Sequence, residues 1–132
     1  MIHLTDMKHF TFAIASLFMG IGVACGAFGA HALRGTIPDT DLAIWEKAVL
    51  YHLVHSLAAL LLLVTPATIL EEPRALRFSQ LLLIGTLIFS GSLYALVLTN
   101  ARWLGAITPI GGVCFIATWI LVSLSVAGRR AR

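Results

Sequence analysis

The chain has 132 residues, of which 59% are hydrophobic and only 11% are charged. An ordinary soluble domain carries roughly 45–50% apolar and about 25% charged residues, so water is the wrong solvent for most of this chain. The formal net charge is +3, but the basic residues are scattered at segment ends and form no patch with interleaved aromatics. The composition predicts an integral membrane protein and excludes nucleic acid as a partner.

Four long stretches contain no Asp, Glu, Lys or Arg, and they cover residues 9–33, 48–70, 78–101 and 103–128. Each is long enough to cross a hydrocarbon core of about 30 Å as an α-helix. A barrel is not expected, because these stretches lack the alternation of barrel strands and unpaired backbone groups in lipid are costly. We predict a single all-α membrane domain over residues 1–132, a four-helix bundle with transmembrane helices near residues 10–33, 46–67, 78–100 and 104–127.

The first predicted helix carries a pattern of small residues. Gly22 and Gly26 are four residues apart and are followed by Gly29, a spacing that lets another helix approach the backbone closely. We expect these glycines to pack within the bundle, with a seam between two copies of the chain as the alternative. The same interpretation applies to three glycines of the third and fourth helices: Gly91, Gly111 and Gly112.

The start of the chain also resembles a secretory or lipoprotein signal, because a lysine and an apolar run precede small residues around Cys25. Cleavage is not expected, since the position three before Cys25 is Gly22, where a lipoprotein signal normally has leucine. The apolar run also continues into the glycines beyond. The sequence leaves open whether translation begins at Met1 or at Met7.

The connections between the predicted helices are short. Gly35 and Pro38 break the chain after the first helix, and Pro66 and Pro73 mark the second connection. The third connection, near residues 100–103, is so short that the last two helices must form an antiparallel hairpin.

The distribution of lysine and arginine predicts the orientation in the membrane. Four spans place both termini on one side of the bilayer. That side carries six basic residues, which are Lys8, Arg74, Arg77, Arg129, Arg130 and Arg132. The opposite side carries three, which are Arg34, Lys47 and Arg102. Because basic residues are enriched in cytoplasmic loops, both termini should be cytoplasmic.

Polar residues gather in the half of the predicted bundle away from the termini. At 1.5 Å of rise per residue, one notable polar residue of each helix falls within roughly 11 Å of the outer surface. Ionisable residues within spans are costly and usually face the bundle interior. We predict one polar cluster of His31, His55, Tyr94 and Thr108, with Tyr51 at its edge and His52 as an optional further member.

Structural hydrogen bonding is the simplest role for this cluster, because a neutral histidine or a tyrosine near the interface can bond a neighbouring helix. The alternatives are a site for a small ligand or a proton, and a metal or haem held by His31 and His55. We predict no catalytic residue, metal or cofactor. The chain has no Ser-His-Asp arrangement, no phosphate-cradling loop and no paired carboxylates within its spans.

Three sequence blocks carry a resemblance: GAFGAHAL at residues 26–33, SGSLY at residues 90–94 and TPIGG at residues 108–112, with Tyr51 and His55 between the first two. Together they resemble the YgdD-like family of small bacterial inner-membrane proteins, over nearly the whole chain. The resemblance implies a multi-pass protein of the bacterial inner membrane with four helices. It supplies no activity and no catalytic residues, because the family has none established.

Three functions are compatible with the sequence. An accessory or assembly protein without catalytic activity is the first hypothesis, because the loops are short and the clearest features are helix-packing surfaces. It would act with a membrane-protein partner or as a homo-oligomer in the lipid bilayer. A small-solute or proton-linked transport unit is the second, and it would need an oligomer because four short helices enclose little volume. An enzyme is the third and is not predicted.

Overall fold

The structure is a computed structural model that describes residues 3–129, and within that range it is helical and contains no strand. Four of its helices are long and apolar enough to cross a membrane, which confirms the predicted all-α, four-span architecture. In chain order the elements are α1 (Leu4–Phe28), the π-helical turn η1 (Gly29–Leu33), α2 (Asp39–Val64), α3 (Glu72–Thr99), the 3-10 turn η2 (Arg102–Ala106) and α4 (Thr108–Ala127).

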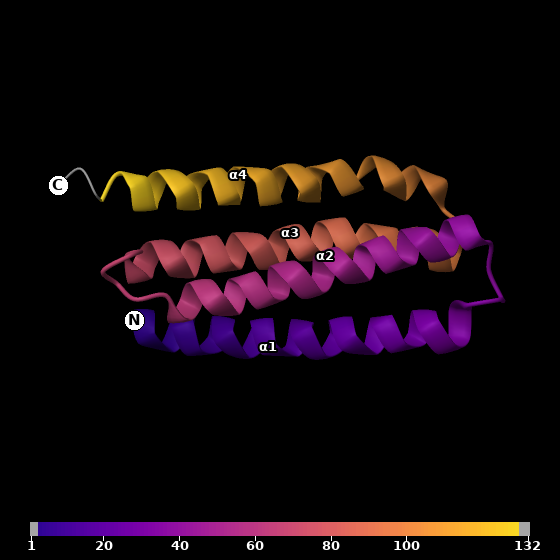
Figure 1. The fold of residues 1–132 in the computed structure, drawn as a ribbon, viewed down its shortest axis with the longest axis horizontal. Coiled ribbons are helices and arrows are strands. Elements are labelled where there is room, and N and C mark those ends of the chain that lie inside the picture. Colours follow the sequence, from indigo (N-terminus) through magenta and orange to yellow (C-terminus); the bar gives the residue numbers. More distant parts are fainter. Residues whose placement is uncertain (1–2, 130–132) are drawn as a thin grey trace.

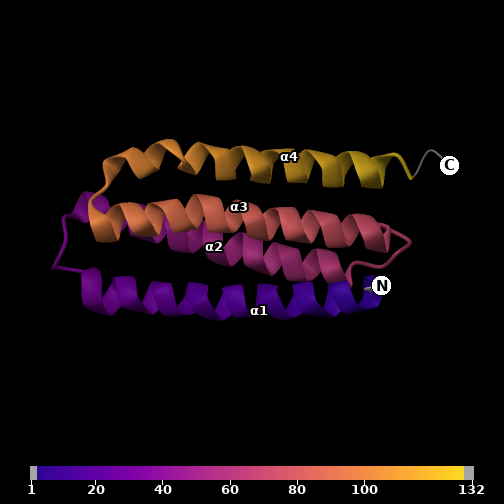
Figure 2. The same cartoon turned by 180° about the vertical axis from the view of Figure 1, so that it is seen from behind.

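The α2–α3 hairpin forms the centre of the bundle, with α1 on one side and α4 on the other (Figure 1). The view from behind shows the same order (Figure 2). In the described residues, α4 packs on α3 and η2, and its backbone approaches neither α1 nor α2. In the most apolar 18-residue stretches of α2 and α3, 44% and 39% of the residues are buried, against 17% in the corresponding stretches of the two outer spans. The two outer helices therefore present most of their surface outward.

The first three helices extend beyond the charge-free stretches at their N-terminal ends. The main-chain amide of His3 donates to the Asp6 carboxylate at 3.4 Å, a contact typical of a helix start. Acidic residues also occupy the first turns of α2 and α3, where the helix dipole favours negative charge. The sequence criterion therefore located the apolar part of each helix and left out turns that continue beyond it.

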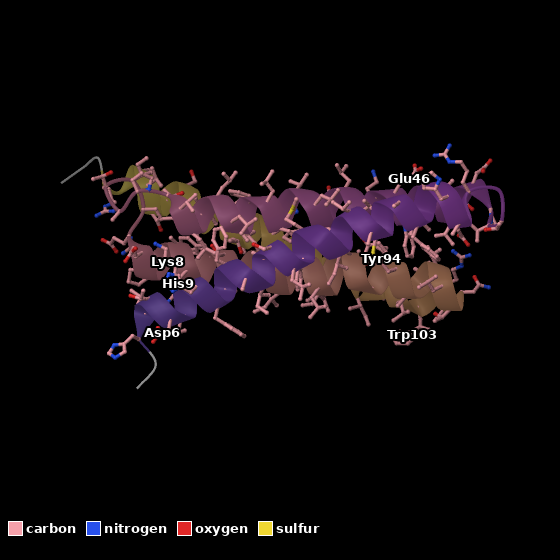
Figure 3. All side chains as sticks on the ribbon, turned by 90° about the horizontal axis from the view of Figure 1, so that it is seen from below. Asp6, Lys8, His9, Glu46, Tyr94 and Trp103 are labelled. Atoms are coloured by element: carbon pink, nitrogen blue, oxygen red, sulfur yellow. The ribbon has the colours of Figure 1, made fainter. Side chains whose placement is uncertain are left out.

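Ion pairs lie at both ends of the bundle. Near the termini, Lys8 Nζ of α1 is 2.7 Å from Glu72 Oε1 at the start of α3. At the opposite end, Arg34 contacts Glu46 at 3.2 Å. Figure 3 shows Lys8 near one end of the molecule and Glu46 and Trp103 toward the other. Charge at both ends with apolar helices between them is the pattern that a bilayer requires.

Glycines permit the closest contacts between helices. A Cβ atom added at Gly111 would lie 2.5 Å from the main-chain nitrogen of Phe89, so α3 and α4 cross with their backbones nearly touching. At Gly29 and Gly22 the added atom would meet Trp45 at 2.6 Å and Leu53 at 2.7 Å, which places both glycines against α2.

The other predicted packing glycines differ from these. Gly26 and Gly112 have looser contacts, at 3.4 Å to Val49 and 3.8 Å to Phe89. At Gly91 nothing lies within 4 Å of an added Cβ, so the prediction of close helix packing there is wrong. The physical reason is that α1 packs mainly on α2 and leaves space beside this part of α3.

Candidate functional site

His52 and Tyr94 form a polar contact between the two central helices. His52 lies in α2 with only 5% of its surface exposed, and its Nδ1 is 3.1 Å from the Tyr94 hydroxyl of α3. From α1, the ring of Phe18 meets the His52 ring edge-on, with 5.7 Å between ring centroids. His52, which the sequence offered only as an optional member, therefore occupies the junction of three helices.

Trp45 extends this contact toward the end of the bundle away from the termini. Its Nε1–H donates to the main-chain carbonyl of Cys25 at 2.8 Å, and its ring centroid is 4.6 Å from that of Tyr94. The accepting carbonyl lies just before the π-helical turn, and such turns are frequent at functional sites. Trp45 is not among the site residues predicted from the sequence. A usable signal is its position seven residues before His52, which places both residues on one face of α2.

A cavity of about 190 Å³ lies between α1 and α3 beside this contact. Its wall includes Phe18 and Cys25 of α1, His52 of α2, and Ser90, Gly91 and Tyr94 of α3. The Ser90 hydroxyl donates away from the cavity, to the main-chain carbonyl of Ala48 at 2.8 Å. The cavity is therefore almost wholly apolar, and the His52–Tyr94 contact lies beside it.

Tyr51 and His55 belong to an aromatic stack on another side of α2. His55 Nδ1 donates to the main-chain carbonyl of Tyr51 at 3.0 Å, and the His55 ring lies parallel to that of Phe115 with 3.6 Å between centroids. The Tyr51 ring stacks on Phe89 with centroids 4.5 Å apart. These rings fill the space between α2 and α4, so packing accounts for the burial of His55.

Thr108 takes part in a separate hydrogen bond at the start of α4. Its hydroxyl is 2.8 Å from that of Ser92, and the Ser92 hydroxyl also lies 3.0 Å from the main-chain carbonyl of Phe89. Ser92 can donate to the carbonyl while it accepts from Thr108. This arrangement joins α3 and α4 and makes Thr108 a link between helices.

His31 lies apart from the other predicted residues. It is exposed in η1, two residues after the inward-facing Gly29, and residues two apart on a helix do not share a face. Gly29 lies against Trp45, and α1 and α2 are antiparallel, so His31 is level with about residue 43 of α2. His55 is about 12 residues beyond that level, or about 18 Å along the helix axis. The prediction of one cluster containing His31 is wrong, and His31 and His55 cannot bind the same metal ion or haem iron.

Comparison with known proteins identifies the family to which the chain belongs. Residues 25–112 match the family described as "Protein of unknown function (DUF423)", and this range contains all three sequence blocks singled out above. A UPF0382 membrane protein of Staphylococcus haemolyticus is 43% identical over 117 residues, covering 83% of this chain and 93% of the relative. The UPF0382 membrane protein YwdK of Bacillus subtilis is 41% identical over 102 residues, covering 77% of this chain and 83% of the relative. No solved structure matches the chain significantly. The chain therefore belongs to the DUF423 family, whose relatives here are named UPF0382 membrane proteins and whose function is unknown.

Proposed function

We propose that the protein is a non-catalytic accessory or assembly subunit of a bacterial inner (plasma) membrane, with both termini cytoplasmic. Within the family we place it with the YgdD-like inner-membrane proteins. One observation carries the proposal: hydroxyl groups inside the spans link one helix to another. Ser79 of α3 donates to the Ala59 carbonyl of α2 at 2.9 Å, and Ser90 donates to the Ala48 carbonyl at 2.8 Å. Such bonds hold transmembrane helices together, as a scaffold requires.

The positions of the acidic residues support a scaffold over the alternative, a small-solute or proton-linked transport unit. Proton-linked carriers commonly place ionisable residues within the membrane, along the path of the proton. Here all six acidic residues lie in connections or in turns near helix starts: Asp6, Asp39, Asp41, Glu46, Glu71 and Glu72. A transport unit would have to depend on the His52–Tyr94 contact.

The outward face of α1 suggests where a partner helix binds. Ser16, Gly20 and Ala24 are exposed at four-residue spacing, and nothing lies within 4 Å of a Cβ added at Gly20. Small residues at this spacing let a second transmembrane helix approach closely. Because Gly22 and Gly29 are occupied by α2, this outward face is the part of α1 that remains available to a membrane-protein partner or to a second copy of the chain.

Site-specific photo-crosslinking in native membranes tests the proposal. A photoreactive residue at Leu17 of α1, which is 58% exposed, should give one discrete protein product, and the same residue at Val113 of α4, which is 65% exposed, should not. Gly20→Leu should abolish the product by blocking close approach. Gly91→Leu is the matched control, because Gly91 also has free space around it but lies on α3. A product that survives Gly20→Leu would contradict the proposed face. Solute-dependent proton uptake by vesicles reconstituted with the protein would contradict the proposal that it is a scaffold.

A further inference from the structure

Two arginines from different helices border a pocket at the end of the bundle that carries the termini. The pocket has a volume of about 400 Å³ and lies where α3 begins and α4 ends (Figure 1). Unlike the cavity beside His52, it has a mostly polar wall, so its charged groups are accessible from within it. The residues that line it are Glu71, Arg74, Leu124, Ser125, Gly128 and Arg129.

Glu71 holds the two arginines at the pocket. Arg74 Nε is 3.3 Å from Glu71 Oε2, and Arg129 Nη2 is 3.8 Å from Glu71 Oε1. Arg129 Nη1 also donates to the main-chain carbonyl of Ala67. A guanidinium has five N–H donors, so these contacts use only some of them. Both Nη groups of Arg74 and the Nε of Arg129 are left without an acceptor among the described residues.

The charges of the pocket define the head of a complementary ligand. Two guanidinium groups face one carboxylate, which leaves an excess of one positive charge. The helix dipoles of α3 and α4 offset each other here, because one helix begins and the other ends at the pocket. A phosphodiester group supplies a single negative charge and oxygens that accept hydrogen bonds from guanidinium groups.

Leu124 gives the pocket an apolar side that faces the membrane. It is 64% exposed, and Leu121, one turn nearer the centre of the span, is 44% exposed. The span Arg102–Ala127 has 26 residues. At 1.5 Å per residue it is about 39 Å long, so its ends pass beyond a hydrocarbon core of about 30 Å into the layer of lipid heads. A molecule in this pocket therefore meets charged groups at its head and an apolar helix face below it, which is the layout of a phospholipid.

We propose that this pocket binds the head of a singly charged anionic phospholipid of the phosphatidylglycerol type. Its phosphodiester oxygens accept hydrogen bonds from Arg74 and Arg129, and one acyl chain follows Leu124 and Leu121 along α4. Basic pockets between transmembrane helices commonly bind the heads of anionic lipids. Phosphatidylethanolamine has the same phosphodiester, but its ammonium group enters a pocket that is already positive. The bound lipid connects the end of α4 to the start of α3.

Native mass spectrometry of the full-length chain in detergent tests this proposal, because it counts bound lipids directly. Delipidated protein is titrated with dioleoylphosphatidylglycerol, with dioleoylphosphatidylethanolamine and with glycerol 3-phosphate. We expect one saturable adduct of phosphatidylglycerol, bound about tenfold more tightly than phosphatidylethanolamine, as one charge-assisted contact would give. Equal binding of the two lipids would overturn the proposal. Displacement of phosphatidylglycerol by glycerol 3-phosphate at equal concentration would overturn the lipid as the occupant and assign the pocket to a free phosphate ester.

Arginine variants test the charged contacts. Arg74→Gln and Arg129→Gln should each weaken the binding of phosphatidylglycerol about tenfold, because each removes one guanidinium from the phosphodiester. Arg34→Gln is the matched control, since it removes the same charge from the ion pair with Glu46 at the opposite end of the bundle. An equal loss of binding in Arg34→Gln would overturn the site, because it would show that only the net charge of the protein matters.

Serine variants test the pocket itself without changing any charge. Ser125→Phe should abolish the adduct by filling the pocket, whereas Ser123→Phe should leave it unchanged, because Ser123 is exposed on α4 and does not line the pocket. Binding by Ser125→Phe at the wild-type level would overturn the proposal. Gly20→Leu lies on α1, so it should abolish the crosslink proposed above and leave lipid binding intact. Failure of one proposal is therefore distinguishable from failure of the other.

Discussion

Arg102 and Asp41 form an ion pair with two hydrogen bonds, which connects η2 to the first turn of α2. Arg102 Nη1 is 2.7 Å from Asp41 Oδ1, and Nη2 is 2.8 Å from Oδ2. The Asp41 side chain is only 11% exposed. Because a guanidinium held at two points fixes orientation as well as distance, the pair sets how the connection before α4 sits on the end of α2.

Arg102→Lys should therefore lower the thermal stability of the purified protein although it keeps the charge, because lysine cannot reproduce the two-point contact. Circular dichroism melting in detergent measures the effect. Arg34→Lys is the control, since the Arg34–Glu46 pair is one contact of 3.2 Å between two exposed side chains. Equal melting temperatures for the two variants would mean that the Asp41 contact has no orienting effect.

Gly111→Ala should destabilise the contact between α3 and α4. The new methyl group would lie 2.5 Å from the main-chain nitrogen of Phe89 and 2.8 Å from the carbonyl oxygen of Gly85, and neither can move without shifting α3. Overpacking of this kind costs about 1–3 kcal/mol. In Gly112→Ala the methyl group stays 3.8 Å from Phe89, so that variant should be neutral or more stable, because alanine favours a helix over glycine. Unfolding titrations with denaturing detergent would show the difference, and equal effects would rule out the close backbone crossing.

Ser90→Ala should reduce stability by about 0.6 kcal/mol and at most about 1.7 kcal/mol, the range measured for hydrogen bonds between transmembrane helices. The lost bond is the one from Ser90 to the Ala48 carbonyl, which joins α3 to α2. Ser123→Ala is the matched control, because Ser123 is exposed on α4. The same unfolding titration applies. A larger loss for Ser123→Ala than for Ser90→Ala would contradict a linking role for Ser90.

The sequence was sufficient for the number of helices because the apolar stretches between charged residues are a direct signature of membrane spans. The length of these stretches was less informative about where helices begin. α2 begins at Asp39, directly after Pro38, because its first turns continue beyond the apolar stretch. α4 begins only at Thr108, because residues 102–106 form a 3-10 turn instead of its first α-helical turn. The length of a stretch without charged residues measures the apolar span of a helix. The starts of α2 and α4 both differ from the prediction at the edge of that span.

The site was harder to predict because it depends on the rotation of each helix about its axis. Tyr51 and His52 are adjacent, yet the first stacks on Phe89 while the second contacts Tyr94 and Phe18. Helical spacing allowed His55 to share a face with either of them, and only the neighbouring helices decide between the two. The outward position of His31 could have been predicted from the sequence, because the face of the first helix that carries Gly22 and Gly29 had already been assigned to helix packing.

Reporter fusions should place both termini in the cytoplasm. A reporter at the C-terminus should be active only inside the cell, and one inserted within residues 35–38 only outside it. The reason is the excess of lysine and arginine on the terminal side, which acts during insertion regardless of later ion pairs such as Lys8–Glu72. Arg74→Ala combined with Arg77→Ala removes two of the six basic residues on that side, so this variant should insert in both orientations. Arg102→Lys keeps the count and should keep the orientation. A C-terminal reporter that is active only outside the cell would reverse the orientation and place the His52–Tyr94 contact in the cytoplasmic half of the membrane.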